Sequence, residues 1–551
     1  MADSVRRDGW HLARWFGPPL VVLALGLSGI TFGLPWRITD RDERLVVESA
    51  AVTFSGDWRP IDVRYPMLFV YTLRAALQPL ALFLSRTLPA GSDTGPLMLA
   101  ELAAHPTPFY LTGRALALLA GVALVVVVAA IGRRLIGERH AWLPAMILAL
   151  TPLFAEYSRY AKVDVPLAVW SMLAVLMAMR FRETGRGALA AVIFVGLAVA
   201  TKWTGVLLVP IVALVAFRAS WRAPSREHLR GVSRFVGFGL IITAILLAST
   251  PYILLSPAKI VRDALRVADH IQAPSGDFAR PGYVLYPEAL AVSSFGAGFL
   301  AAAVFGVVSL LRRRDRAWLP ALLFAALYLA VVFVSQTATP RYLMPAMPVL
   351  ALFSAFGIVR AAESLRRPVW LLALVAFLPT AQPLASRVIA GATNADTRLQ
   401  SLALVESRVA DGSAVLLAGG ERGLPPLVAT NAPPFWNLAW INAEERLGAA
   451  RYAQARELVL RLQRSTGRPA YWVDRVAMSD LESFLTTARP AAIVLYDAES
   501  APLPADGASD YEPPVVFRPR WFTWWKHTNS VVIRRDASAR PLPSARSTAN
   551  P

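Results

Sequence analysis

Long apolar stretches dominate this sequence and constrain its fold more than any other feature. An apolar run of about 20 residues can cross a bilayer as a helix. A helix is required there because backbone groups in lipid find no water to bond. Hydrophobic residues make up 56% of the chain, which exceeds the usual content of soluble domains. We therefore predict a mostly α-helical, polytopic membrane protein with about 11 transmembrane helices. The candidate segments are 16–34, 109–131, 141–157, 164–180, 187–201, 204–217, 235–253, 289–310, 317–335, 342–359 and 368–384.

The basic residues predict the orientation of these helices. The net charge is +19, but most arginines form short clusters between apolar runs rather than a stripe on a folded domain. This pattern argues against nucleic acid as a partner and is typical of cytoplasmic loops. With eleven spans and a cytoplasmic N-terminus (N-in/C-out), every cluster falls inside, as expected for a bacterial inner (plasma) membrane protein. The clusters lie within 133–139, 180–186, 218–234, 312–316 and 360–367.

One further apolar segment, 67–84, decides the topology. Counting it as a span would move every later arginine cluster to the opposite face. Arg64, Arg74 and Arg86 lie along it. Basic residues spread along an apolar segment favour helices on the membrane surface. We therefore predict outer-face juxtamembrane helices within a long first periplasmic loop, 35–108.

The last third of the chain differs from the rest in its pattern of apolar and polar residues. The runs Ala414–Ala418 and 491–496 read as short buried strands, and 443–464 has helical spacing with charged residues on one face. We predict a small α/β domain over 386–537 that is soluble and extracytoplasmic, after a transmembrane domain over 1–385. The final segment, 538–551, is rich in Pro, Ser and Ala and is expected to be disordered.

Ionisable residues gather in the loops predicted to face outward. Asp42 and Glu43 follow the first span, Asp164 opens a later one, and Lys202 and Arg341 lie in two further loops. Asp164 could simply cap a helix, and either cation could extend to lipid headgroups. Alternatively, a carboxylate at the membrane boundary can act as a general base. Two cations near it would suit a phosphate group.

Several short motifs occur together and in order along the chain. They are Asp42-Glu43, Gly56-Asp57-Trp58, Tyr65-Pro66, the segment 158–164, Lys202-Trp203-Thr204-Gly205 and Arg341-Tyr342-Leu343-Met344-Pro345. Taken as a set, they resemble the GT-C superfamily of membrane glycosyltransferases, over about residues 10–385. The most similar branch contains the protein O-mannosyltransferases and the lipid A aminoarabinose transferases.

The resemblance implies a reaction and its participants. Such enzymes move a sugar from a polyprenyl-phosphate carrier to an acceptor hydroxyl at the outer face, with inversion. The acceptor could be a lipid, a glycan or a protein. No cofactor is implied with certainty, and a divalent cation at Asp42 and Asp164 stays open. The implied catalytic carboxylates are Asp42, its neighbour Glu43, and Asp164. The implied donor-phosphate residues are Lys202, Arg341, Tyr342 and Arg159, and Tyr65, Asp57 and Trp203 would line the substrate cavity.

Two other functions compete with this one. A multi-span transporter or lipid flippase would also carry a few charges among its helices, but transporters usually show paired halves, and the sequence has no internal repeat. A scaffold protein would make the outer acids and cations incidental. Two further features have weaker interpretations. Loop 254–288, with Asp263, Asp269 and His270, could form a lid. The tryptophans Trp521, Trp524 and Trp525 could stack on sugars, but an aromatic belt or the core edge of a small domain is the favoured interpretation.

Overall fold

The structure of the chain is a computed structural model that forms two compact units. The first comprises Met1–Ile30, Asp62–Ala75 and Thr112–Val388, and the second comprises Thr31–Ile61, Ala76–Leu111 and Ile389–Pro551. Thus segments of the first loop share a unit with the C-terminal part. The structure describes residues 2–34, 41–59, 61, 65–86, 93–217, 225–258, 261–262, 265, 280–336, 338–393, 396–419, 425, 427–430, 444, 447–496, 508–519 and 528–536.

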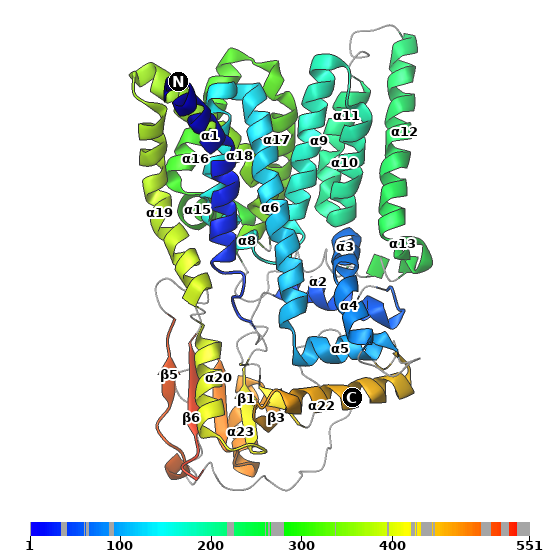
Figure 1. The fold of residues 1–551 in the computed structure, drawn as a ribbon, viewed down its shortest axis with the longest axis vertical. Coiled ribbons are helices and arrows are strands. Elements are labelled where there is room, and N and C mark those ends of the chain that lie inside the picture. Colours follow the sequence, from blue (N-terminus) through cyan, green and yellow to red (C-terminus); the bar gives the residue numbers. More distant parts are fainter. Residues whose placement is uncertain are drawn as a thin grey trace. The chain divides into compact units, whose positions relative to one another are not determined.

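Helices make up nearly all of the first unit (Figure 1). Their apolar faces form one continuous buried core that extends from Val22 to Ala376. The α-helices are α1 (Ala2–Leu27), α3 (Leu68–Ala76), α6 (Thr107–Ile136), α7 (Trp142–Ala149), α8 (Pro152–Tyr157), α9 (Asp164–Thr184), α10 (Ala188–Thr201), α11 (Val209–Ala216), α12 (Ser225–Ser249), α13 (Tyr252–Leu255), α15 (Gly282–Glu288), α16 (Ala297–Arg313), α17 (Leu319–Phe333), α18 (Met347–Leu365) and α19 (Val369–Thr393).

Within the described residues, six helices are long and apolar enough to cross a membrane, or up to eight if each of two bent pairs counts as one span. Three shorter apolar helices accompany them. A polytopic helical protein is therefore confirmed, whereas the count of eleven spans and the N-in/C-out arrangement stay predictions. The segment predicted to lie on the membrane surface forms α3 and α4 (Gln78–Ser85), which are bent by 42°.

Glycines allow α16 and α18 to pack closely. A Cβ on Gly357 would lie 2.0 Å from the carbonyl oxygen of Ala302, and one on Gly306 would lie 2.2 Å from that of Phe353. Small residues of this kind bring helix backbones together where lipid supplies no hydrophobic drive between helices. The two glycines thereby fix the contact between these helices.

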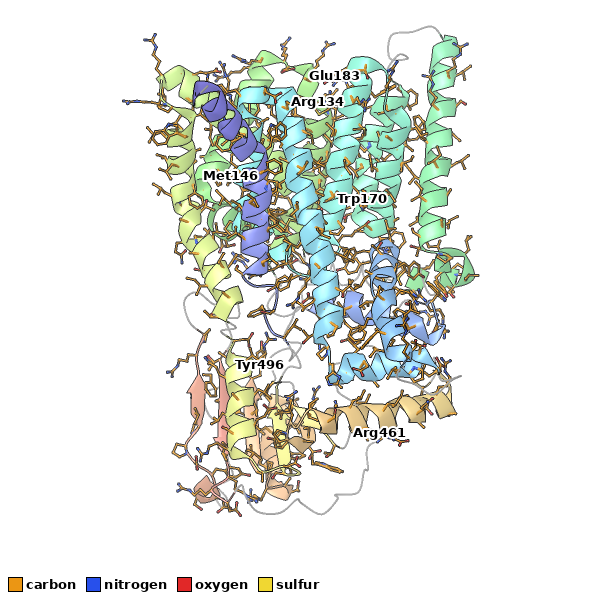
Figure 2. The ribbon with its side chains drawn as sticks, in the orientation of Figure 1. Arg134, Met146, Trp170, Glu183, Arg461 and Tyr496 are labelled. Carbon is orange, nitrogen blue, oxygen red and sulfur yellow. The ribbon has the colours of Figure 1, made fainter. Side chains whose placement is uncertain are left out.

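Arginines from separate loops meet at one end of the helices. Arg134, in the last turn of α6, forms an ion pair with Glu183 near the end of α9, and both are labelled in Figure 2. Arg182 donates to the carbonyl of Arg316 in the loop after α16. Three of the predicted clusters, 133–139, 180–186 and 312–316, are therefore neighbours. Since α9 has 21 residues, this end lies about 30 Å from Asp164 at the other terminus of the helix.

The second unit contains a six-stranded mixed sheet with the order β2-β3-β1-β4-β6-β5. Strands β2, β3, β1 and β4 are parallel, and β6 and β5 are antiparallel additions. In the central register, Leu416 of β1 faces Asp474 of β3 and Ile493 of β4. The strands are β1 (Ala414–Ala418), β2 (Val428–Ala429), β3 (Ala470–Val476), β4 (Ala492–Tyr496), β5 (Val515–Phe517) and β6 (Asn529–Ile533).

Alternating side chains of these strands enter two buried clusters. Leu417 and Val494 belong to one, with α20, whereas Leu416 and Ile493 belong to the other, with α23. This alternation is expected for strands covered on both faces. The small C-terminal sheet region predicted from the sequence is confirmed, and both predicted strands are present. The helices of this unit are α2 (Arg41–Val52), α4, α5 (Thr94–Ala104), α20 (Thr397–Arg408), α22 (Ala449–Ser465) and α23 (Leu481–Thr487).

Some residues singled out in the sequence lie outside the described part of the chain. The lid interpretation of 254–288 rests largely on such residues, and the tryptophan cluster and the tail 538–551 fall there entirely. The individual residues are Arg64, Asp263, Asp269, His270, Trp521, Trp524 and Trp525.

Candidate functional site

A buried ion pair in the first unit joins two residues that the sequence singled out. Lys202 Nζ donates to Asp164 Oδ1 at 2.6 Å, and the two side chains are 8% and 3% exposed. Asp164 is the first residue of α9, and the N-cap position belongs to Val163, which has no side-chain capping bond. The carboxylate therefore binds a lysine rather than capping its own helix.

A break between two short helices places the lysine. Helix α10 ends at Thr201, Lys202 is extended, and a 3-10 helix, η3 (Trp203–Leu208), follows. Gly205 makes this turn possible, because a Cβ there would lie 2.4 Å from the carbonyl carbon of Ala198. The chain thus reverses tightly and presents Lys202 toward Asp164.

Aromatic rings and a second cation surround this pair. Lys202 Nζ lies 5.0 Å from the ring centroid of Tyr342 and 5.8 Å from that of Tyr65. Arg341 Cζ lies 5.4 Å from the same Tyr342 ring, and its charge acts on Asp164. Arg341 and Tyr342 belong to a 3-10 helix, η8 (Pro340–Ala346), that leads into α18. We call Asp164, Lys202, Arg341, Tyr65 and Tyr342 the cation–tyrosine site.

The electrostatics of this site favour an anion. The Asp164 carboxylate is subject to the charges of Lys202, Arg341 and Lys162. Cation–π contacts hold Lys202 and Arg341 beside tyrosine rings, whose hydroxyl groups can donate hydrogen bonds. An arrangement of ammonium, guanidinium and phenol donors suits phosphate oxygens.

A divalent cation at Asp164 would have to compete with Lys202. Its Oδ1 already accepts a bond from Lys202, and two further cations act on it. A metal there would be repelled by three positive side chains. No group of three or more His, Asp or Glu that could hold a metal occurs among the residues that the structure describes.

A second group of charges lies on the segment before α9. Lys162 is 2% exposed, and its Nζ lies 4.6 Å from the Tyr157 ring centroid. Arg159, for which a donor-phosphate role stays a prediction, donates to the carbonyl of Arg387 at 2.9 Å and lies 5.9 Å from the Tyr160 ring. The hydrogen bond from the Arg159 side chain to the Arg387 carbonyl connects the segment before α9 to α19.

Arg387 connects three segments of the first unit. Its guanidinium forms an ion pair with Glu156 of α8 and donates to the carbonyl of Ser293 at 3.0 Å. Ser293 belongs to a π-helix, η6 (Ala289–Ser294). The Glu156 side chain is buried at 6% exposure, whereas the Arg387 side chain is 19% exposed.

The sequence analysis gave no role to Arg114 and Arg387, and it included Lys162 only as part of the segment 158–164. Arg114 could have been found, because it interrupts the apolar run 109–131, and ionisable residues within spans are rarely incidental. It is fully buried, and its Nη1 donates to the carbonyl of Ile30 at 2.6 Å.

The first-loop acids belong to the second unit. Asp42 and Glu43 lie in the first turn of α2 and are buried. Asp57 accepts a bond from Arg59 Nε at 2.9 Å, and Trp203 of the first unit is half-buried. That Asp42 or Glu43 meets Asp164 therefore stays a prediction, as does a role for Asp57 or Trp203 in a shared cavity.

Comparisons with solved structures identify the fold. The structure of ArnT from Cupriavidus metallidurans bound to undecaprenyl phosphate is similar over 95% of this chain and 98% of that chain, with a TM-score of 0.50 and 15% identity. The apo state of the same protein gives a TM-score of 0.49 and 16% identity over 96% and 98% of the two chains. The chain therefore has the fold of ArnT. Together with the family match given next, this bears out the predicted resemblance to the GT-C superfamily.

Part of the sequence matches a family within this superfamily. Residues 100–261 fit the family model for dolichyl-phosphate-mannose-protein mannosyltransferases. This stretch is less than half of the chain and contains Asp164 and Lys202. An oligosaccharyltransferase from Archaeoglobus fulgidus, tethered to an acceptor peptide, has a TM-score of 0.47 and 13% identity over 79% of this chain and 63% of that chain. No curated protein matches the sequence.

Proposed function

We propose that this protein transfers a sugar from a polyprenyl-phosphate carrier to an acceptor hydroxyl at the outer face of a bacterial inner membrane. The observation that carries the proposal is the cation–tyrosine site. It combines a buried Asp164–Lys202 pair with Arg341 and two tyrosines at one end of the helices. ArnT, which has this fold, was solved with undecaprenyl phosphate, a carrier of the proposed chemical class.

The arginine-rich loops support the orientation. Three of them are neighbours at the end of α9 opposite Asp164. Loops rich in arginine face the cytoplasm in most membrane proteins. The cation–tyrosine site then faces outward, about 30 Å away along α9. An N-in/C-out arrangement with an extracytoplasmic C-terminal part follows from the same rule.

The proposed reaction is a single displacement at C1 of the sugar. The acceptor oxygen forms the new bond to C1 while the bond from C1 to the phosphate oxygen breaks, so the anomeric centre inverts. A carboxylate takes the proton of the acceptor hydroxyl. The carrier phosphate leaves with the bonding electrons, and Lys202 and Arg341 stabilise its negative charge.

The contact between Asp164 and Lys202 supports different roles for the acids. Because Asp164 is bonded to Lys202 at 2.6 Å, we assign it the task of holding the lysine in position for the phosphate. By resemblance, Asp42 or Glu43 is then the general base. Both residues lie in one helical turn, and the proposal leaves the choice between them to mutagenesis.

The test is transfer by purified protein. The protein in detergent is incubated with radiolabelled sugars on polyprenyl phosphate, together with lipid, glycan and peptide acceptors, and labelled product is measured. We expect turnover with at least one combination of sugar donor and acceptor, and loss of turnover in Asp42→Asn or Glu43→Gln. Arg313→Met, which removes an exposed charge at the arginine-rich end, is the control and should keep full activity.

The alternative is a transporter or lipid flippase. Reconstituted vesicles distinguish it, since a flippase would move labelled polyprenyl-phosphate sugar between leaflets without forming a glycosylated product. Movement without transfer for every acceptor would overturn the proposal.

A further inference from the structure

Helix α22, from the C-terminal part, packs on a helix of the first loop. In the second unit α22 lies alongside α5 (Figure 1). Val459 of α22 is buried together with Ala100 and Ala103 of α5. Leu458 and Leu462 pack against the edge of this cluster. The contact is therefore apolar and uses small residues on one side.

Arg451, at the start of α22, adds two polar contacts. Its Nη2 donates to the carbonyl of Ser55 at 2.9 Å, and its guanidinium forms an ion pair with Asp93. Asp93 also accepts a bond from the Gly95 amide at 2.9 Å and so caps α5. One arginine thereby joins the C-terminal part to the start of α5 and to the segment that ends at Ser55.

That segment continues directly from the acid-bearing helix. Helix α2 ends at Val52, and the 3-10 helix η1 (Thr53–Ser55) follows without a gap. Helix α5 packs against both, and a Cβ on Gly95 would lie 2.6 Å from Ser55 Cα. The far end of α2 is thus fixed from two sides, by α5 and by Arg451.

We propose that the C-terminal domain positions the acid-bearing helix α2 and that Arg451 is the positioning residue. This inference rests on the proposed function, in which Asp42 or Glu43 of α2 is the general base. The domain is then a structural part of the catalytic machinery, because its own helix fixes the segment that carries the base. Arg451 acts through α2 and contacts no reacting atom.

Hydrogen exchange measures the positioning without any substrate. The measurement follows backbone amides in peptides covering residues 41–55 of the full-length protein. In Arg451→Ala we expect exchange there to rise about threefold to tenfold, the range for loss of a partly exposed charged hydrogen bond. Peptides from β1 and β4 should be unchanged, which shows that the domain itself is folded.

Matched variants separate position from charge. Arg461 lies on the same helix (Figure 2), is 70% exposed and pairs only with Glu457 among the residues described. Arg461→Ala should therefore leave exchange over 41–55 unchanged. Arg451→Lys keeps the charge but loses the planar guanidinium fork, and it should give an intermediate exchange rate. Gly95→Ala should loosen the same peptides through the backbone clash with Ser55.

Kinetics then connect the position of α2 to the chemistry. In Arg451→Ala we expect kcat to fall about threefold to tenfold, with the KM for the lipid donor unchanged, and Arg451→Lys to recover part of the loss. Unchanged exchange over 41–55 would overturn the inference, and so would faster exchange with full kcat. If the wild-type protein transfers no sugar, the proposed function fails, whereas the exchange data still decide whether Arg451 holds α2.

Discussion

Replacement of Lys202 by methionine tests the central ion pair most directly. Methionine keeps a similar length and removes the charge, so Asp164 would be left buried without its closest partner. The variant asks two questions at once: how much the pair stabilises the fold, and whether the lysine serves the donor phosphate. A second variant, Lys202→Met with Asp164→Asn, separates the two answers.

The geometry of the pair sets the expected losses of stability and of carrier affinity. The pair is 8% and 3% exposed and its atoms are 2.6 Å apart, so solvent screens it little. Removal of one partner from such a pair costs about 3–5 kcal/mol, and replacement of both by neutral groups is often close to neutral. The double variant should therefore regain most of the stability. Loss of one charged hydrogen bond to the phosphate, about 1.5–3 kcal/mol, corresponds to donor binding weaker by about 10- to 100-fold.

The assay measures both quantities in the same detergent. Thermal unfolding ranks the stability of wild type, Lys202→Met, Asp164→Asn and the double variant. Titration with a polyprenyl phosphate that carries no sugar gives the affinity of the protein for the carrier phosphate. We expect the two single variants to be the least stable and the double variant to approach wild type. Lys202→Met and the double variant should both bind the carrier weakly.

Two results would refute the reasoning. A double variant as unstable as Lys202→Met would mean that the buried pair does not account for the loss. Carrier affinity equal to wild type in both variants would remove Lys202 from phosphate binding, even if stability changed as expected.

Three further predictions follow from other contacts. Arg387→Met should lower the melting temperature because it strands buried Glu156, and adding Glu156→Gln should restore much of it; no recovery would count against the pair. Gly357→Ala should lower the melting temperature strongly because its Cβ would lie 2.0 Å from the Ala302 carbonyl oxygen. The control is Gly237→Ala on α12, whose Cβ would have nothing within 4 Å and should be tolerated. Equal melting temperatures for the two variants would contradict the close packing of α16 and α18. The chain has no cysteine, so in intact cells an impermeant thiol reagent should label cysteine at Ser479 but not at Ala317, both exposed; the reverse pattern would invert the topology.

The sequence by itself determined the class of architecture. A bilayer has a fixed thickness and leaves no water for the backbone, so the apolar runs had to become helices. Buried runs in the last third became β1 and β4 for a similarly local reason, because a central strand is apolar on both faces. The polar residues at the ends of apolar runs also stood out, including Asp164, Lys202 and Arg341.

Only the tertiary structure decided which of these residues meet. Asp164 and Lys202 are 38 positions apart, and the spacing left helix capping and lipid contact equally open. Arg387 reaches Glu156, and Arg451 reaches Ser55 across 396 positions. Such pairs depend on how helices pack against one another. A local pattern fixes which residues are helical and which face is apolar, but the partner of a buried charge is chosen by the chain segments that packing brings to it.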